Sequence, residues 1–185
     1  MTYGTRIDGY PGTSKLLHWL VATCVLTTVP VAIAMKRVAA GPAQDFLFNF
    51  HKSLGVLILI LMVLRLINRF VRGAPMPEPT IEPWQRALSS AVHGLIYVLL
   101  LALPVVGFIA NNFYAAPLPF FGLFTLPPLF PENKALAETL FGYHALAGWI
   151  LIGLVLMHVS GALFHHYIRG DNVLRRMLAR ALGGI

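Results

Sequence analysis

Four apolar stretches, each long enough to cross a lipid bilayer, occupy most of this chain and restrict what it can fold into. They lie near residues 16–35, 46–71, 90–114 and 139–168. A helix needs about 20 apolar residues to span the hydrocarbon core, and it satisfies its own backbone hydrogen bonds there. Only 11% of the 185 residues are charged, and nothing remains for a soluble domain of ordinary size. We therefore predict an all-α fold, an integral membrane four-helix bundle in which residues 1–185 form a single domain.

The first stretch resembles a secretion signal in one respect, because Ala32-Ile33-Ala34 has the small residues of a cleavage site. A signal peptide has an apolar region of about 7–15 residues. This stretch is longer and carries His18 near its start. We therefore expect it to be retained as a membrane span.

The cationic residues are distributed unevenly between the two sides of the predicted bundle. Ten belong to the amino terminus, the link between the second and third stretches, and the tail: Arg6, Lys15, Arg65, Arg69, Arg72, Arg86, Arg169, Arg175, Arg176 and Arg180. Four belong to the other two links: Lys36, Arg37, Lys52 and Lys134. Lys and Arg concentrate on the cytoplasmic side of membrane proteins, so we expect both termini to be cytoplasmic. The formal charge of +7 is therefore placed as in a membrane protein, and no basic, aromatic-interleaved patch outside the spans indicates a nucleic-acid partner.

The carboxyl-terminal tail, residues 171–182, combines apolar with basic side chains. The apolar ones are Leu174, Met177 and Leu178, and the basic ones are Arg175, Arg176 and Arg180. This mixture predicts a basic amphipathic helix that lies on anionic membrane lipid.

The link over residues 115–131 is apolar and rich in proline, unlike the other links. Its prolines are Pro117, Pro119, Pro127, Pro128 and Pro131, and its phenylalanines are Phe120, Phe121, Phe124 and Phe130. We expect this loop to fold across the outer end of the bundle as a lid, or to lie in the lipid interface. An interfacial anchor is favoured over a substrate gate.

The seven histidines fall at distinct depths in the predicted bundle. His51 and His144 begin the two spans that start from the outer side, and His18 and His93 begin the two that start from the inner side. His158 follows His144 by 14 residues, which returns it to within about 40° of the same helix face, roughly 21 Å along the axis. Ionisable groups at such depth are costly and are usually functional.

The outer layer holds His51 and His144, each followed four residues later by a glycine, Gly55 and Gly148. A residue four positions on shares the histidine's face, so these glycines leave room for a broad planar ring. Two imidazoles with such room suit bis-histidine haem ligation. Zinc is less apt, because its sites use three or four protein ligands. Cys24 is alone in mid-span, can form no disulfide within the chain, and is expected to be a packing residue.

The inner layer offers more histidines than one haem can use. His158 is the best ligand candidate because of its spacing from His144, and Gly161 follows it at the third position. His18 is the preferred partner and His93 is the alternative. The pair that remains, His93 and His165, could bind or protonate a redox substrate near the inner surface. We expect His166, between His165 and Tyr167, to be structural.

Arg65 is a charged residue inside a predicted membrane span, and it follows His51 by 14 residues. The same rotation places it on the face of His51 but in the inner layer. A guanidinium there could bind a haem propionate through two hydrogen bonds. Alternatively, its side chain extends to the cytoplasmic surface.

Three cations lie near the outer mouth beside His51: Lys36, Arg37 and Lys52, offset in part by Asp45. A positive rim raises the local concentration of a small anion. The alternative is that these are solvated side chains near lipid head groups. A bis-histidine haem has no vacant position for oxygen, so electrons would enter at the haem edge.

In this order the motifs resemble the bacterial cytochrome b561 family, and specifically its superoxide oxidase branch, over nearly the full length. The resembling segments are Leu17-His18-Trp19, residues 51–55 with Arg65, residues 93–97 and 102–107, His158 with His165-His166-Tyr167, and residues 171–177. The link over residues 115–131 matches the family pattern least well.

The resemblance implies a membrane bundle with two b-type haems, multi-pass in the bacterial inner membrane. Carried over by position, His51 and His144 would ligate the outer haem, and His18 and His158 the inner one. It implies ubiquinone as the electron acceptor near the cytoplasmic side, where His93 and His165 remain. It also implies superoxide as the electron donor at the outer, periplasmic face.

Three functions compete at this point. The first is a superoxide:ubiquinone oxidoreductase. The second is a non-enzymatic electron-transfer subunit that links quinone to a redox partner protein, such as a dehydrogenase or hydrogenase. A haem-free transporter that uses the intramembrane histidines as a proton relay is the least favoured.

Overall fold

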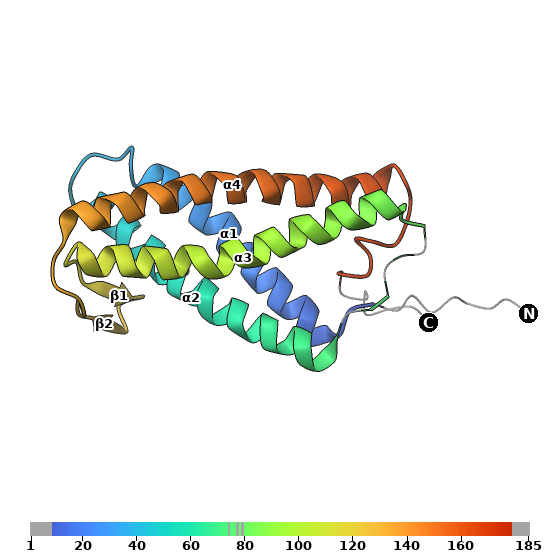
Figure 1. The fold of residues 1–185 in the computed structure, drawn as a ribbon, viewed down its shortest axis with the longest axis horizontal. Helices are drawn as coiled ribbons and strands as arrows, with labels where there is room; N and C mark the ends of the chain where they lie inside the picture. The colour runs from blue at the N-terminus through green and yellow to red at the C-terminus, as the bar shows by residue number, and fades with distance from the viewer. Residues whose placement is uncertain (1–8, 74, 77, 79, 179–185) are drawn as a thin grey trace, which may run out of the picture.

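Four long helices and one short hairpin make up the computed structural model, which describes residues 9–73, 75–76, 78 and 80–178. In chain order the elements are α1 (Gly12–Ala34), α2 (Pro42–Arg72), α3 (Pro83–Phe113), β1 (Leu118–Phe120), β2 (Phe124–Leu126) and α4 (Lys134–Tyr167). All four helices are long and apolar enough to cross a membrane. The predicted all-α four-helix bundle is therefore confirmed (Figure 1).

The bundle has two ends of different character (Figure 1). The hairpin and the link between α1 and α2 lie at one end, which we call the outer end. The start of α1, the connection between α2 and α3, and the tail lie at the opposite, inner end. Helix α1 packs along α2 and α3 packs along α4, while α2 also contacts α3.

A small apolar core fills the middle of the bundle. It consists of Val21, Val25, Ile58, Met62, Leu100, Leu103 and Leu151, with Cys24 among the half-buried residues packed against it. Leu151 lies midway along α4 between His144 and His158. The core therefore separates the two histidine layers, one of which lies on each side of it along the bundle.

The residues at the helix ends explain where the helices begin and end. Pro42 and Pro83 occupy the first turns of α2 and α3, where a missing backbone N–H costs nothing. A capping box between Glu82 and Gln85 closes the start of α3. Gly73 ends α2 with a φ of 68°, a conformation that favours glycine.

The proline-rich link folds as an antiparallel hairpin, in which Leu118 pairs with Leu126. The strands were not predicted from the sequence, and β1 contacts α2 at the outer end. Ser53 of α2 holds β1: its Oγ donates to the Pro119 carbonyl (2.9 Å) and accepts from the Phe121 N–H (3.0 Å). Leu123 at the hairpin turn is 77% exposed, so insertion of the turn into the lipid interface remains a prediction.

The tail differs from the amphipathic helix that its composition predicts. Within its described part, residues 171–178 form turns that fold back on the inner end. The Met177 carbonyl accepts from Trp19 Nε1 (3.1 Å), and the Leu178 carbonyl accepts from Lys15 Nζ (2.7 Å). Arg176 is buried and donates to the Met76 carbonyl (2.7 Å). Of the cations that entered the charge asymmetry, Arg6 and Arg180 lie outside the described residues.

Candidate functional site

Two histidines from different helices meet near the outer end. The ring centroids of His51 on α2 and His144 on α4 are 6.2 Å apart, with the ring planes at 81°. The Nδ1 of His144 lies 3.0 Å from the Leu103 carbonyl, and because a carbonyl only accepts, this nitrogen carries the proton. The Nδ1 of His51 lies 3.1 Å from Thr28 Oγ1. In both rings the opposite nitrogen, Nε2, is left to another partner.

Three histidines meet in the inner layer, with His158 of α4 between the other two. The His18 ring of α1 lies 6.1 Å from the His158 ring, and the His93 ring of α3 lies 4.9 Å from it. The Nδ1 of His93 donates to the Ser89 carbonyl (2.6 Å) one turn earlier on α3. The predicted two layers of histidines are therefore present.

The separations of the rings test whether a metal-centred cofactor fits between them. A metal–imidazole bond is about 2.0 Å long, so two imidazoles on opposite sides of one ion place their ring centres roughly 6 Å apart. The pairs His51–His144 and His18–His158 meet this requirement, at 6.2 and 6.1 Å. The 4.9 Å separation of His93 and His158 is too short for it.

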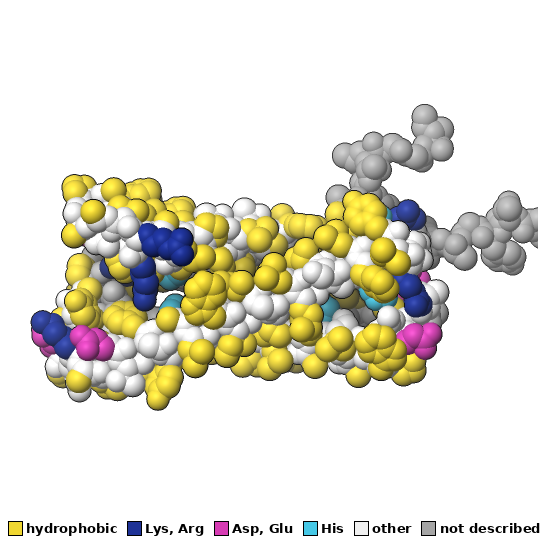
Figure 2. Space-filling view, turned by 90° about the horizontal axis from the view of Figure 1, so that it is seen from above, with side chains coloured by type: hydrophobic (Ala, Val, Ile, Leu, Met, Phe, Trp, Pro, Cys, Tyr) yellow, Lys and Arg dark blue, Asp and Glu magenta, His cyan; other side chains and the backbone are white. Residues whose placement is uncertain are grey.

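The glycines near these histidines leave open space, as a planar group would need. A Cβ built on Gly55, Gly148 or Gly161 meets no atom within 4 Å beyond the local backbone. Gly107 of α3 is different, because a Cβ there would lie 3.1 Å from the His144 ring. Figure 2 shows two hollows with histidine side chains inside them, one toward each end of the bundle. The donor set and the space therefore fit a haem at each level.

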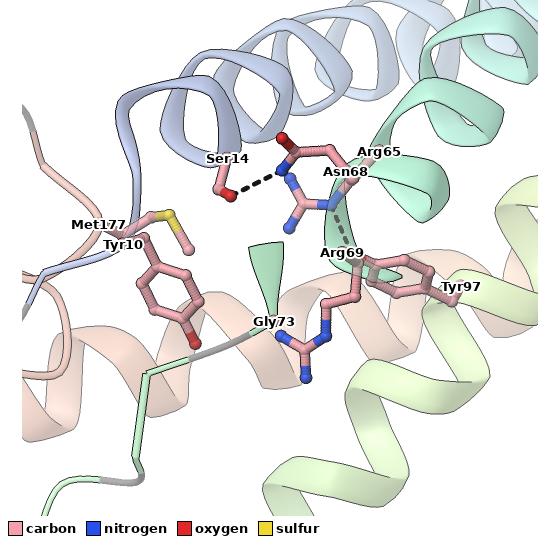
Figure 3. Close-up of a pocket in the computed structure, with 8 residues that line it drawn as sticks. All are labelled: Tyr10, Ser14, Arg65, Asn68, Arg69, Gly73, Tyr97 and Met177. Carbon is pink, nitrogen blue, oxygen red and sulfur yellow. Dashed lines mark hydrogen bonds between the residues drawn. The ribbon is translucent and has the colours of Figure 1, made fainter. Parts of the chain in front are cut away.

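Arg65 lies in a pocket at the inner end and has one unsatisfied nitrogen. Its Nε donates to the Tyr97 hydroxyl (2.7 Å), and its guanidinium lies 5.5 Å from the centre of that ring. Its Nη1 is buried and has no hydrogen-bond partner in the described part of the chain. Figure 3 shows the pocket, which is lined by Tyr10, Ser14, Arg65, Asn68, Arg69, Gly73, Tyr97 and Met177. A buried cationic nitrogen of this kind suits a site for an anionic group better than a side chain that extends to the cytoplasmic surface.

The remaining histidines lie at the inner end of the bundle. The Nδ1 of His165 lies 2.5 Å from the Asp171 carboxylate, and both side chains are largely buried. His93 is exposed, and its ring contacts that of His158. His166 packs edge-on against Tyr167, and its buried Nδ1 has no partner among the described residues. The sequence analysis did not predict the contact between Asp171 and His165, because it depends on how the tail folds back.

The three cations of the outer mouth differ in their surroundings. Lys36 and Arg37 are exposed, and Lys36 interacts electrostatically with His144. Lys52 is half-buried, and its Nζ donates to the Pro117 carbonyl (2.9 Å). It therefore also helps to hold the hairpin, and Asp45 interacts with it electrostatically.

Comparison with known proteins gives a consistent result over the full length. The family model described as prokaryotic cytochrome b561 matches residues 9–180. Cytochrome b561 homolog 2 of Escherichia coli (strain K12) is 28% identical over 185 residues, covering 98% of this chain and 97% of that protein. A Yersinia pestis protein named probable superoxide oxidase CybB is 31% identical over 167 residues, covering 90% and 94%. Cytochrome b562 of Cereibacter sphaeroides is 28% identical over 179 residues, covering 94% and 98%.

The match to the family model extends over far more than half of the chain and includes every histidine of both layers. The four helices that can cross a membrane agree with it. The chain belongs to the prokaryotic cytochrome b561 family, and is thus a multi-pass membrane redox protein of a family that implies haem b.

Proposed function

We propose that this protein is a superoxide:ubiquinone oxidoreductase with two haem b groups, and that it transfers electrons from superoxide at the outer, periplasmic face to ubiquinone near the cytoplasmic side. The observation that carries the proposal is the pair of matched histidine separations, 6.2 and 6.1 Å, on either side of an apolar core. Similarity to a protein named probable superoxide oxidase CybB supports the choice of donor. Both termini are then cytoplasmic, as the distribution of Lys and Arg favours.

The ligands we assign are His51 and His144 for the outer haem, and His18 and His158 for the inner haem. Hydrogen bonds from Nδ1 fix the orientation and tautomer of a metal-bound imidazole, which is the role we give to the Leu103 carbonyl at His144. Bound in this way, haem b supplies one-electron redox chemistry without an open coordination position. The shorter distance of His93 from His158 leaves His93 available for the acceptor.

Arg65 is assigned to a propionate of the inner haem. Its buried, unpartnered Nη1 would otherwise be a costly group to hold inside the bundle. A carboxylate accepting from it would satisfy the nitrogen and form a charge-assisted hydrogen bond. Tyr97 holds the guanidinium in place by accepting a hydrogen bond from its Nε.

At the outer face, Lys36, Arg37 and Lys52 are assigned to attract superoxide. Superoxide is a small anion, so a cationic rim raises its local concentration and its rate of encounter. Lys36 lies close enough to His144 to act on it electrostatically. At the inner face, His93 and His165 are assigned to hydrogen-bond ubiquinone and to supply its protons.

The balanced reaction is two superoxide ions, one ubiquinone and two protons giving two molecules of oxygen and one ubiquinol. The test uses the purified protein in detergent, an enzymatic source of superoxide and ubiquinone-1, with ubiquinol followed by its absorbance. Rapid turnover that stops on addition of superoxide dismutase supports the proposal. Absence of turnover, with haem bound, instead identifies the protein as an electron-transfer subunit that needs a redox partner protein.

A further inference from the structure

The contact between His165 and Asp171 joins α4 to the tail at the inner end. Their side chains are only 13% and 5% exposed, and His165 Nδ1 lies 2.5 Å from Asp171 Oδ2. A carboxylate only accepts, so the Nδ1 of His165 carries a proton. The Nε2 of His165 is then the nitrogen that can exchange a proton with a substrate.

His165 also has a defined position relative to the inner histidine layer. It follows His158 by seven residues on α4, which places it about 20° from the same helix face and roughly 10 Å further toward the inner end. A ubiquinone that accepts electrons from the inner layer on this face would meet His165 next. Asp171, in the tail, contacts the Nδ1 edge of His165, which leaves the Nε2 edge for a substrate.

The second oxygen of Asp171 shows that this carboxylate also has a structural role. Its Oδ1 accepts from the Val173 N–H (3.1 Å), and the Asp171 N–H donates to the His165 carbonyl (3.1 Å). An asparagine could accept the same bond from Val173 through its amide oxygen. Its amide nitrogen would then face His165 Nδ1 as a donor, which reverses the tautomer of the ring.

We infer that Asp171 is a positioning residue of the quinone site: it fixes the tautomer of His165 and stabilises the imidazolium that delivers a proton to ubiquinone. This rests on the proposed function. In each delivery the Nε2–H bond of His165 breaks and an O–H bond forms on reduced ubiquinone. Water on the cytoplasmic side returns the proton to Nε2, and Asp171 stays ionised throughout. The electrons come from superoxide, one from each ion.

The test separates proton delivery from electron transfer. Haem-loaded wild type, Asp171→Asn, Asp171→Glu and the control Glu138→Gln are reduced with stoichiometric dithionite and mixed with ubiquinone-1 or ferricyanide in a stopped-flow instrument. Ferricyanide takes electrons without protons, so it reports the integrity of the electron path. Glu138 is an exposed acid of the same helix at the outer end.

We expect D171N to slow the reoxidation of the protein by ubiquinone-1 at least tenfold. This lower limit is smaller than the 10²–10⁴-fold that general acid–base catalysis typically contributes. Ferricyanide should reoxidise D171N at the wild-type rate, and D171E should recover much of the quinone rate. The slow step of D171N should also show a larger rate decrease in D₂O than that of wild type. E138Q should match wild type in every assay.

An unchanged quinone rate in D171N, or equal slowing with both acceptors, overturns the inference. If D171N fails to hold haem, His165→Gln decides, because glutamine keeps a hydrogen bond to Asp171 but carries no transferable proton. A wild-type quinone rate in H165Q also overturns the inference. Failure of wild type itself to react with ubiquinone-1 would instead refute the proposed function.

Discussion

The rings of His18 and His158 lie 6.1 Å apart, the separation expected for two imidazoles that share one metal ion. The same relationship recurs toward the outer end between His51 and His144, at 6.2 Å. These pairs come from different helices, so each would also join the two halves of the bundle. Loss of one ligand should therefore affect both cofactor content and stability.

The choice of the inner ligand gives the first prediction. His18→Ala should reduce the haem content from two to one per chain, because His18 would be one of the two residues that hold the inner haem. His93→Ala should retain both haems, since the 4.9 Å separation from His158 leaves no room for an ion between them. Haem is counted from the pyridine haemochromogen spectrum against protein concentration. Loss of a haem in H93A with retention in H18A would reverse our assignment.

Gly107 gives a prediction about the outer pair. Gly107→Val should displace the His144 ring, because even a Cβ there would lie 3.1 Å from it. We expect a loss of about 1–3 kcal/mol of stability, typical of overpacking, and partial loss of the outer haem. Thermal unfolding and haem content measure both effects.

The matched control for this change is Gly94→Val on the same helix. A Cβ on Gly94 meets nothing within 4 Å beyond the local backbone, so only the local helix preference changes. Equal effects of the two substitutions would show that the close approach of Gly107 to His144 has no particular importance.

Ser53 gives a prediction about the hairpin. Ser53→Ala removes the group that bonds the Pro119 carbonyl and the Phe121 N–H, and each unpaired buried group costs about 1–3 kcal/mol. The hairpin should then open, and a protease that cuts after aromatic residues should cleave it faster. The exposed Ser90 of α3 supplies the control, S90A. If the protease cleaves S53A no faster than wild type, other contacts hold the hairpin.

The outer cations give a prediction about kinetics that depends on the proposed function. Replacing both Lys36 and Arg37 with Gln should lower the rate with superoxide several-fold at low ionic strength, with little difference at high salt, because screening removes electrostatic attraction. Lys134→Gln, also exposed at the outer end but paired with Glu132 (3.2 Å), should change the rate much less. A salt dependence identical to wild type in the double variant would contradict a role in attracting the anion.

Much of the fold and part of the candidate site could be predicted from the sequence. The four spans followed from the length of the apolar stretches, and the two layers followed from the rotation and rise between His144 and His158. Both are properties of single helices, which local sequence determines. The pairing of His51 with His144 needed only the further assumption that consecutive helices alternate in direction, so that the second and fourth both start from the outer side.

The parts that the sequence did not predict depend on contacts between distant segments. The hairpin in the proline-rich link is held by Ser53, which is more than 60 residues away in the chain. The tail is held against the inner end by its backbone carbonyls, which accept from side chains of α1, and by the Arg176 side chain, which donates to the α2–α3 connection. The partnership of Asp171 with His165 follows from that fold. No periodicity in the sequence signals any of these contacts.

The central claim is that each chain holds two haem b groups, one at each histidine layer. The most direct measurement is the haem content of the purified wild-type protein, obtained from the pyridine haemochromogen spectrum and quantitative amino-acid analysis. The account predicts two haem b per chain, with the characteristic reduced α-band. A value of one, or no haem at all, would contradict it.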